Sequence, residues 1–278
     1  TRPVKPRRLG MDFETEWARS YPARLGRAAV LDGAIRPLLR AVASPTVRGL
    51  DRIEHVRGPA LFVANHSSHL DTPLILTALP VRFRHRTVVV AAADYFFDKH
   101  WKGALWAFAL NAVPVERTRV SRRSADDTAA LLAEGWSVMI YPEGGRTPDG
   151  WAQPFKAGAA YLSQRIGAPV VPIHIEGTGR VFGKGAKKVR PGSTTVTFGR
   201  PLFPEPGEKA GAFAARIEAT VAVLADEQDT DWWSARRRAA AGTTPSLAGP
   251  AAGAWRRSWA LQRGPHPVDP TTPRWPKL

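Results

Sequence analysis

The stretch of sequence that decides the fold runs from residue 60 to residue 71 and reads Ala-Leu-Phe-Val-Ala-Asn-His-Ser-Ser-His-Leu-Asp. Its first five residues are apolar, as in a short buried strand, and the apolar run 73–79 that follows has the length of a short helix. A strand, a polar turn and a helix in this order are typical of an α/β fold. The polar residues are therefore expected at the carboxyl end of a strand, where the functional groups of such sheets gather.

A histidine and an aspartate five residues apart in this stretch form a candidate catalytic dyad. His66 would leave the end of the strand, and Asp71, at the start of the helix, would accept a hydrogen bond from one imidazole nitrogen. The other nitrogen would then be free to act as a general base. The chain has no Cys and no Gly-x-Ser-x-Gly motif to supply an enzyme nucleophile. The pattern therefore predicts that a substrate hydroxyl or a water molecule makes the attack.

Two other interpretations of these residues stay open. A single histidine is often a structural residue that is held by hydrogen bonds. Alternatively, His66, His69 and Asp71 could ligate a metal, since His-x-x-His spacing can bring two imidazoles together. A metal site needs a third or fourth ligand of suitable spacing, which His100 and His174 do not offer. We expect no metal.

Charge and composition limit the classes of protein to consider. The 278 residues carry a formal net charge of +16, and 44% of them are hydrophobic, which is enough for a full core. The lack of Cys excludes disulfides and zinc–thiolate sites. No apolar run approaches the roughly 18 residues of a membrane-spanning helix, and no signal peptide is visible. We expect a soluble or peripheral protein whose surface binds polyanions: nucleic acid, anionic lipid headgroups or phosphorylated substrates.

Short β-prone runs alternate with helical patterns along the middle of the chain. Strands are expected at 52–56, 60–64, 86–93, 112–115, 136–141, 170–175 and 194–198. Helices are expected at 100–110, 121–134, 157–166 and 207–226. The alternation predicts an α/β fold with a mixed, largely parallel sheet flanked by helices.

Four regions follow from these patterns. Residues 1–10 are basic and expected to be disordered. Residues 11–48 predict an amphipathic helix pair, broken near Pro22, that packs on the core, faces a membrane, or does both. Residues 49–227 form the main domain. Residues 228–278 hold five of the ten tryptophans among arginines and prolines; this tail either wraps around the domain, contacts a membrane or is disordered.

A second motif follows the predicted strand 136–141 and reads Tyr-Pro-Glu-Gly-Gly-Arg-Thr over residues 141–147. Gly144 and Gly145 would let backbone N–H groups approach a ligand closely, and Arg146 can bind a phosphate with two hydrogen bonds. Glu143 could anchor Arg146, orient the loop or contact an acceptor hydroxyl. Such a motif in isolation is usually only a turn.

Two further cations lie near predicted element ends. Lys156 opens a helix, where the helix N-terminus adds positive potential, and Arg117 follows the strand 112–115. Neither a Walker P-loop nor a Gly-x-Gly-x-x-Gly motif follows a strand, which disfavours nucleotide hydrolysis and dinucleotide redox chemistry. These cations complete a candidate phosphate site.

Together these motifs resemble the four sequence blocks of the glycerolipid acyltransferases, the PlsC-like lysophosphatidic acid acyltransferase family. Residues 65–71 resemble its His-x-x-x-x-Asp block, 115–117 its second block, 141–147 its Phe-Pro-Glu-Gly-Thr-Arg-Ser block and 170–175 its fourth. The blocks occur in family order, and the resemblance covers roughly residues 50–225. Tyr141, Thr147 and above all Gly145, which stands where the family has Thr, depart from the pattern.

The resemblance implies an acyltransferase that moves a fatty acyl chain from acyl-CoA or acyl carrier protein to the hydroxyl of a lysophospholipid such as 1-acyl-glycerol-3-phosphate. His66 would be the base and Asp71 its partner. Arg117, Arg146 and Lys156 would hold the acceptor phosphate, with Glu143, Gly144 and Gly145 ordering that site. No metal or cofactor is implied, and the enzyme would sit on the cytoplasmic side of an anionic membrane.

Two alternatives from other classes remain. The same dyad could activate water in a thioesterase or another hydrolase. The chain could also be a non-catalytic basic module that binds a membrane or nucleic acid, although no recognised nucleic-acid motif is present and we expect no nucleic acid partner.

Overall fold

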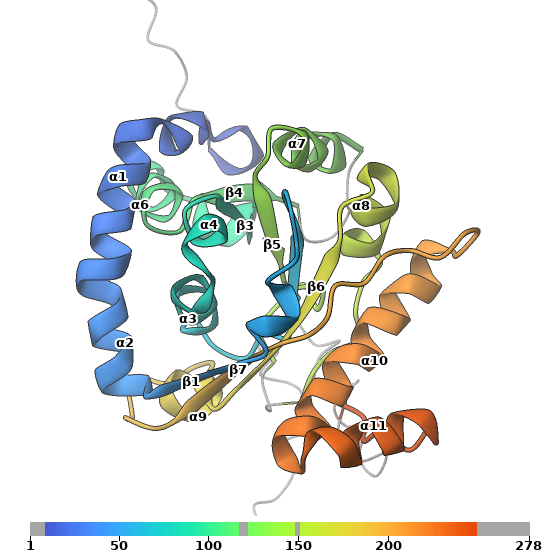
Figure 1. Ribbon diagram of the computed structural model, residues 1–278. Coiled ribbons are helices and arrows are strands. Elements are labelled where there is room, and N and C mark those ends of the chain that lie inside the picture. Colours follow the sequence, from blue (N-terminus) through green and yellow to red (C-terminus); the bar gives the residue numbers. More distant parts are fainter. Residues whose placement is uncertain (1–8, 117–121, 148–150, 249–278) are drawn as a thin grey trace, which may run out of the picture.

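A mixed sheet forms the centre of the protein in the computed structural model, which describes residues 9–116, 122–147 and 151–248 (Figure 1). The described residues form the strands β1 (Pro45–Arg48), β2 (Leu61–Ala64), β3 (Thr87–Ala92), β4 (Ala112–Val115), β5 (Ser137–Ile140), β6 (Val170–Glu176) and β7 (Thr194–Phe198). They lie in the order β1-β7-β6-β2-β5-β3-β4. All neighbours run parallel except β6 and β7. The expected α/β class with a mixed, largely parallel sheet is confirmed.

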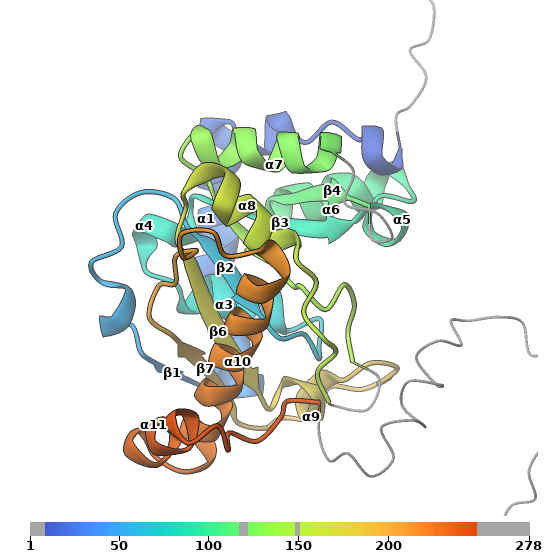
Figure 2. The same cartoon turned by 90° about the vertical axis from the view of Figure 1, so that its right-hand side faces the viewer.

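Helices cover both faces of this sheet. The longer ones are α1 (Tyr21–Val30), α2 (Arg36–Ala43), α3 (Asp71–Ala78), α6 (His100–Leu110), α7 (Arg122–Ala133), α8 (Gly158–Ile166), α10 (Ala210–Asp229) and α11 (Trp232–Ala240). The shorter ones are α4 (Val81–Arg84), α5 (Ala93–Phe96) and α9 (Thr178–Phe182). In Figure 2, α8 and α10 lie in front of the sheet and α3 lies behind it.

Strand β2 shows why both faces must be covered. All four of its side chains are buried. Phe62 and Ala64 belong to the core cluster that includes α2, α3 and α4. Leu61 and Val63 belong to the cluster that includes α7, α8 and α10. A strand that is apolar on both faces is typical of the interior of a parallel sheet, and this central strand carries the polar motif at its end.

The N-terminal helical region agrees with its prediction in one respect and differs in another. The expected break near Pro22 is present, because the 3-10 turn Glu16–Arg19 ends at Ser20, which is extended. Helix α1 then begins with Pro22 in its first turn, where the missing N–H is not needed. The π-helical turn Leu31–Ile35 joins α1 to α2 without a gap. Helix α2 ends before Ser44, and the next four residues form β1, which pairs with β7 at the edge of the sheet. The prediction of helix up to residue 48 was therefore wrong at its end.

The predicted strand 52–56 was also wrong. Residues Asp51–Ile53 form a single 3-10 turn. The chain turns at Gly49, which has a φ of +73°, and Arg52 donates a hydrogen bond of 3.2 Å to the carbonyl of Phe198. The segment is thus held against the end of β7 as a turn. Its last residue, Ile53, is fully buried in the core.

Part of the C-terminal tail is helical and packs on the domain. Helix α11 lies against α10, where Arg238 contacts Asp226 at 2.5 Å and Ala235 is fully buried. Trp232 and Trp233 remain largely exposed. The expectations for residues 1–8 and 249–278 lie outside the described residues. Among the described helices, none has the combination of length and apolar character that crossing a bilayer demands.

Candidate active site

The end of β2 is tied to β6 by a side chain rather than by further strand pairing. Asn65 donates through Nδ2 to the carbonyl of Ile175 at 2.8 Å and accepts from the Ile175 N–H at 2.8 Å. This amide reproduces one more step of the ladder between the two strands. It fixes the direction in which the chain leaves the sheet, and His66 is the next residue.

His66 and Asp71 are brought together as a hydrogen-bonded pair. The His66 Nδ1 lies 2.8 Å from Asp71 Oδ2, and Asp71 is fully buried at the first turn of α3. The same carboxylate oxygen accepts the backbone N–H groups of Ser67 at 2.7 Å and Ser68 at 2.9 Å. A carboxylate with three donors on one oxygen is held firmly. It assigns the proton of a neutral His66 to Nδ1 and leaves Nε2 as the basic nitrogen.

The short helix α9 holds the loop between His66 and Asp71 through two hydrogen bonds. The Ser67 hydroxyl lies 2.9 Å from the Thr178 hydroxyl, and the Ser68 hydroxyl donates to the carbonyl of Phe182 at 2.5 Å. Both contacts join residues more than 100 positions apart. The turn that carries the dyad is therefore braced by the segment that follows β6.

Glu143, from the loop after β5, orders the backbone around His66. Its Oε1 accepts the His66 N–H at 2.7 Å, and its Oε2 accepts the Gln153 N–H at 2.8 Å. Burial raises the pKa of Glu143 to about 7, against the opposing effect of these two hydrogen bonds. The carbonyl of His66 also accepts the Thr147 N–H at 3.0 Å. Glu143 was expected to anchor Arg146, orient the loop or contact an acceptor hydroxyl. Its two hydrogen bonds to backbone N–H groups fit the second of these roles.

Some of the residues that were predicted to bind a phosphate lie near one another or near the dyad. Gly144 has a φ of +75°, and a Cβ placed there would lie 2.7 Å from Lys156 Nζ, so the lysine passes directly over this glycine. Gly145 has open space where a Cβ would point. The charge of Arg146 lies close enough to lower the pKa of His69. Arg117 lies outside the described residues.

His66 and Lys156 share a mostly apolar cavity of about 190 Å³. It is lined by residues of β3, β4, β5, α6 and α8, and Val89, Phe96 and Trp106 form part of its apolar wall. Tyr141, Gly144 and Gly145 line it near the dyad. The arrangement places an imidazole and a lysine side chain in the wall of one apolar cavity.

His69 is a cavity residue for which the sequence analysis assigned no catalytic role. Burial, followed by the charges of Arg146 and His66, lowers the pKa of His69 to about 4, so its imidazole is neutral at neutral pH. Its ring stacks near Tyr95 at a centroid distance of 6.1 Å. Within the described residues, no group of three or more His, Asp or Glu side chains could hold a metal ion.

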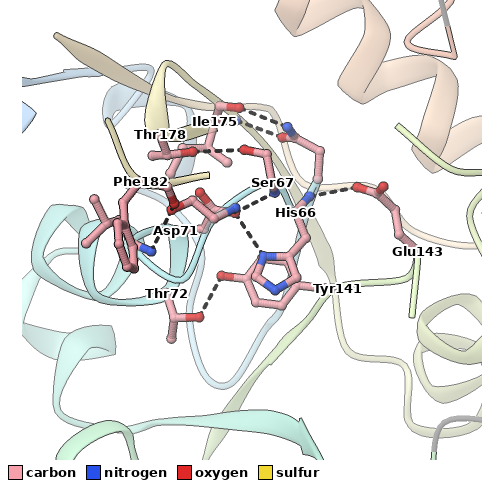
Figure 3. A network of polar contacts seen from close by, with 12 residues as sticks. His66, Ser67, Asp71, Thr72, Tyr141, Glu143, Ile175, Thr178 and Phe182 are labelled. Carbon is pink, nitrogen blue, oxygen red and sulfur yellow. Dashed lines mark hydrogen bonds and ion pairs between the residues drawn. The ribbon is translucent and has the colours of Figure 1, made fainter. Parts of the chain in front are cut away.

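Tyr141 is a second residue whose place near the dyad the sequence did not reveal. Its ring stacks on that of His66 with centroids 4.0 Å apart and an interplanar angle of 19°, and its hydroxyl lies 2.9 Å from the Thr72 hydroxyl (Figure 3). The sequence offers a weak signal for this contact, because Tyr141 ends one predicted strand, His66 follows another, and the two strands could be neighbours.

Comparison with known proteins gives concordant results. The acyltransferase family model matches residues 44–176. A chloroplastic 1-acyl-sn-glycerol-3-phosphate acyltransferase of Brassica napus is 30% identical over 170 residues, which cover 59% of this chain and 46% of the relative. The human 1-acyl-sn-glycerol-3-phosphate acyltransferase beta is 28% identical over 151 residues, which cover 54% of this chain and 52% of that protein. The matches thus span about half the length of these curated relatives.

One solved structure supports the fold. The crystal structure of the 1-acyl-sn-glycerophosphate acyltransferase PlsC from Thermotoga maritima matches with a TM-score of 0.57 and 23% sequence identity. The match covers 78% of this chain and 84% of the other. The overall arrangement of strands and helices is thus shared with a solved protein.

Proposed function

Through residues 44–176 the chain belongs to the acyltransferase family, in its PlsC-like glycerolipid branch, and we propose that it transfers a fatty acyl group from a thioester to the hydroxyl of a lysophospholipid. The single observation that carries this proposal is the position of His66, which is paired with buried Asp71 and lines an apolar cavity. The relatives are named 1-acyl-sn-glycerol-3-phosphate acyltransferases. We therefore propose 1-acyl-sn-glycerol-3-phosphate as the acceptor.

The dyad supplies general-base catalysis in this reaction. His66 Nε2 takes the proton of the acceptor hydroxyl as its oxygen attacks the thioester carbonyl. Asp71 holds the imidazole through Nδ1 and stabilises the imidazolium that forms. The tetrahedral intermediate then collapses, its carbon–sulfur bond breaks, and the proton on His66 passes to the leaving thiolate. Base catalysis of this kind typically contributes about 10²–10⁴-fold in rate.

The acceptor phosphate would be bound by the cations beside the cavity. Lys156 lies in the cavity wall and Arg146 lies close to His69, and we propose Arg117 as a third ligand on the basis of the sequence resemblance. Glu143 would keep the loop in place through its two backbone hydrogen bonds. Gly144 and Gly145 would let the loop backbone approach the phosphate.

The donor would be acyl-CoA or acyl carrier protein, with the acyl chain in the apolar cavity. The reaction as proposed needs no metal and no bound cofactor, because the thioester already carries an activated carbonyl.

An anionic membrane surface is the proposed partner, since the acceptor is a lipid. The described structure supports this with exposed apolar side chains on α1, α2 and α6, which include Tyr21, Leu25, Leu38 and Trp101. Helix α1 packs on α6 (Figure 1). Arg40 is exposed on α2. Exposed aromatic and basic side chains together suit a lipid headgroup layer. Because the donors are cytoplasmic thioesters, we propose the cytoplasmic side of the membrane.

The test is release of free thiol from a long-chain acyl-CoA, with and without lysophosphatidic acid, together with detection of the diacyl product. His66→Ala should lower the acceptor-dependent rate by at least about 10²-fold. His55→Ala, which alters an exposed histidine away from the cavity, is the matched control and should keep the wild-type rate. Release without acceptor would instead support a thioesterase. A wild-type protein inactive with several lysolipids and both donors would contradict the proposal.

A further inference from the structure

Tyr141 covers one face of the His66 imidazole. The two rings are nearly parallel, with an interplanar angle of 19° and a centroid distance of 4.0 Å (Figure 3). They come from the ends of the neighbouring strands β5 and β2. We propose that Tyr141 is a positioning residue for His66: its ring holds the imidazole in the plane in which Nδ1 meets Asp71 and Nε2 stays available. This inference rests on the proposed function.

The tyrosine ring is itself anchored next to the dyad. Its hydroxyl lies 2.9 Å from the hydroxyl of Thr72, the residue that follows Asp71 on α3. Burial raises the pKa of Tyr141 well above its ordinary value, so the phenol keeps its proton and can donate to Thr72. The imidazole, the carboxylate and the phenol thus all connect to the first turn of one helix.

Two physical effects follow from the stacking. The imidazole can lose its hydrogen bond to Asp71 by rotating about its Cβ–Cγ bond, and a ring packed on its face opposes that rotation. The imidazolium that forms during proton transfer would also lie over an aromatic face, which attracts a cation. Both effects favour the transition state over a misaligned ground state, so they act on the rate more than on substrate binding.

The ring and the hydroxyl of Tyr141 make separable contributions. The stacking requires only an aromatic ring, which the related family block supplies with Phe. The hydroxyl adds the anchor to Thr72. Tyr141→Phe therefore keeps the aromatic ring, and Tyr141→Leu replaces it with a smaller apolar side chain that cannot stack. Tyr161→Leu on α8 is the matched control, because Tyr161 is 44% exposed and does not line the cavity.

Charged and titratable groups around His66 are the same in these variants. They are Asp71, His69, Glu143, Arg146, Lys156 and Glu116. A change in the pH dependence of the rate between Tyr141→Leu and Tyr141→Phe would therefore report the loss of the ring over the imidazolium. Its direction is fixed, because loss of a group that stabilises protonated His66 moves the acidic limb of the profile to lower pH.

The experiment measures kcat, KM for both substrates and the pH profile of kcat/KM. Tyr141→Phe should stay within about threefold of the wild-type kcat. Tyr141→Leu should lose about tenfold or more in kcat with both KM values within about twofold, and its acidic limb should move to lower pH. Tyr161→Leu should match wild type. An unchanged kcat in Tyr141→Leu, a change confined to KM, or an equal loss in Tyr141→Phe would overturn the proposal.

A second measurement does not depend on activity or on the folding of the leucine variant. An aromatic ring stacked on the imidazole shifts the His66 ring-proton NMR signals upfield, and His66→Ala identifies those signals by their absence. The shift should be present in wild type and in Tyr141→Phe. Its absence from wild type would contradict the stacking itself. A wild-type protein with this shift but without acyl transfer would contradict the proposed function and leave the ring geometry established.

Discussion

One oxygen of Asp71 accepts three hydrogen bonds, and two substitutions of this residue should differ in how many of these bonds they keep. Asp71→Ala leaves the N–H groups of Ser67 and Ser68 without an acceptor in a partly buried turn. Each such loss costs about 1–3 kcal/mol, so the variant should lose about 2–6 kcal/mol. Typical domains have only about 5–15 kcal/mol of stability, so inactivity of Asp71→Ala would not distinguish chemistry from unfolding.

Asp71→Asn separates the two effects. The amide oxygen can replace Oδ2 and still accept both N–H groups, and only the difference between a charged and a neutral acceptor is lost. That difference is about 1 kcal/mol per bond, so we expect a stability loss of about 2 kcal/mol. The imidazolium loses its counter-charge, however. The equivalent change in a Ser-His-Asp enzyme lowers kcat about 10⁴-fold, and we expect about 10²–10⁴-fold here.

The assay compares urea unfolding and acceptor-dependent acyl transfer for wild type, Asp71→Asn and Asp71→Ala. Asp51→Asn, on an exposed turn, is the control for loss of one negative charge and should change neither quantity. A folded Asp71→Asn that keeps more than a tenth of the wild-type kcat would refute the electrostatic role of Asp71. An Asp71→Asn variant as unstable as Asp71→Ala would refute the hydrogen-bond argument.

Two further predictions concern residues beside and within the site. Burial lowers the pKa of His174 from 6.5 to about 4, so its stabilising contribution is complete above pH 6.5 and is lost as the pH falls towards 4. Wild type should therefore lose about 2 kcal/mol between pH 7.5 and pH 5 that His174→Gln does not lose, and equal slopes in chemical unfolding would contradict this. Gly144→Ala should lower stability, because its φ is +75° and the new Cβ would meet Lys156, whereas Gly145→Ala has open space and should keep the wild-type stability. Similar unfolding midpoints for the two glycine variants would show that the loop backbone adapts.

Several elements were predictable because their signals are local. Helix α6 and strand β4 have the predicted bounds, since each is a largely apolar run that ends at a polar residue, Asn111 after the helix and Glu116 after the strand. The helix–strand alternation indicated the class of fold in the same way. The pairing of His66 with Asp71 was also predictable, because a strand end, a turn and a helix start lie within seven residues.

Strand β1 is an element that local sequence signals do not predict. Its four residues, Pro45–Arg48, follow a helical pattern directly and have no alternation of their own. They become a strand because β7, about 150 positions away, offers a free edge with matching register. The same absence of local information explains the wrong strand at 52–56, whose β-branched and apolar residues are held in a turn by Arg52.

The amino-acid sequence by itself determined which residues could act as base, partner and phosphate ligands, because chemistry depends on residue type and on short spacings along the chain. Only the tertiary structure decided what surrounds them. The order of β6, β2 and β5 brings Asn65 to Ile175, Glu143 to the backbone of His66, and Tyr141 onto its ring. These contacts join residues 75 to 110 positions apart. Local periodicity says which face of an element is buried, but it does not encode which strand will be its neighbour.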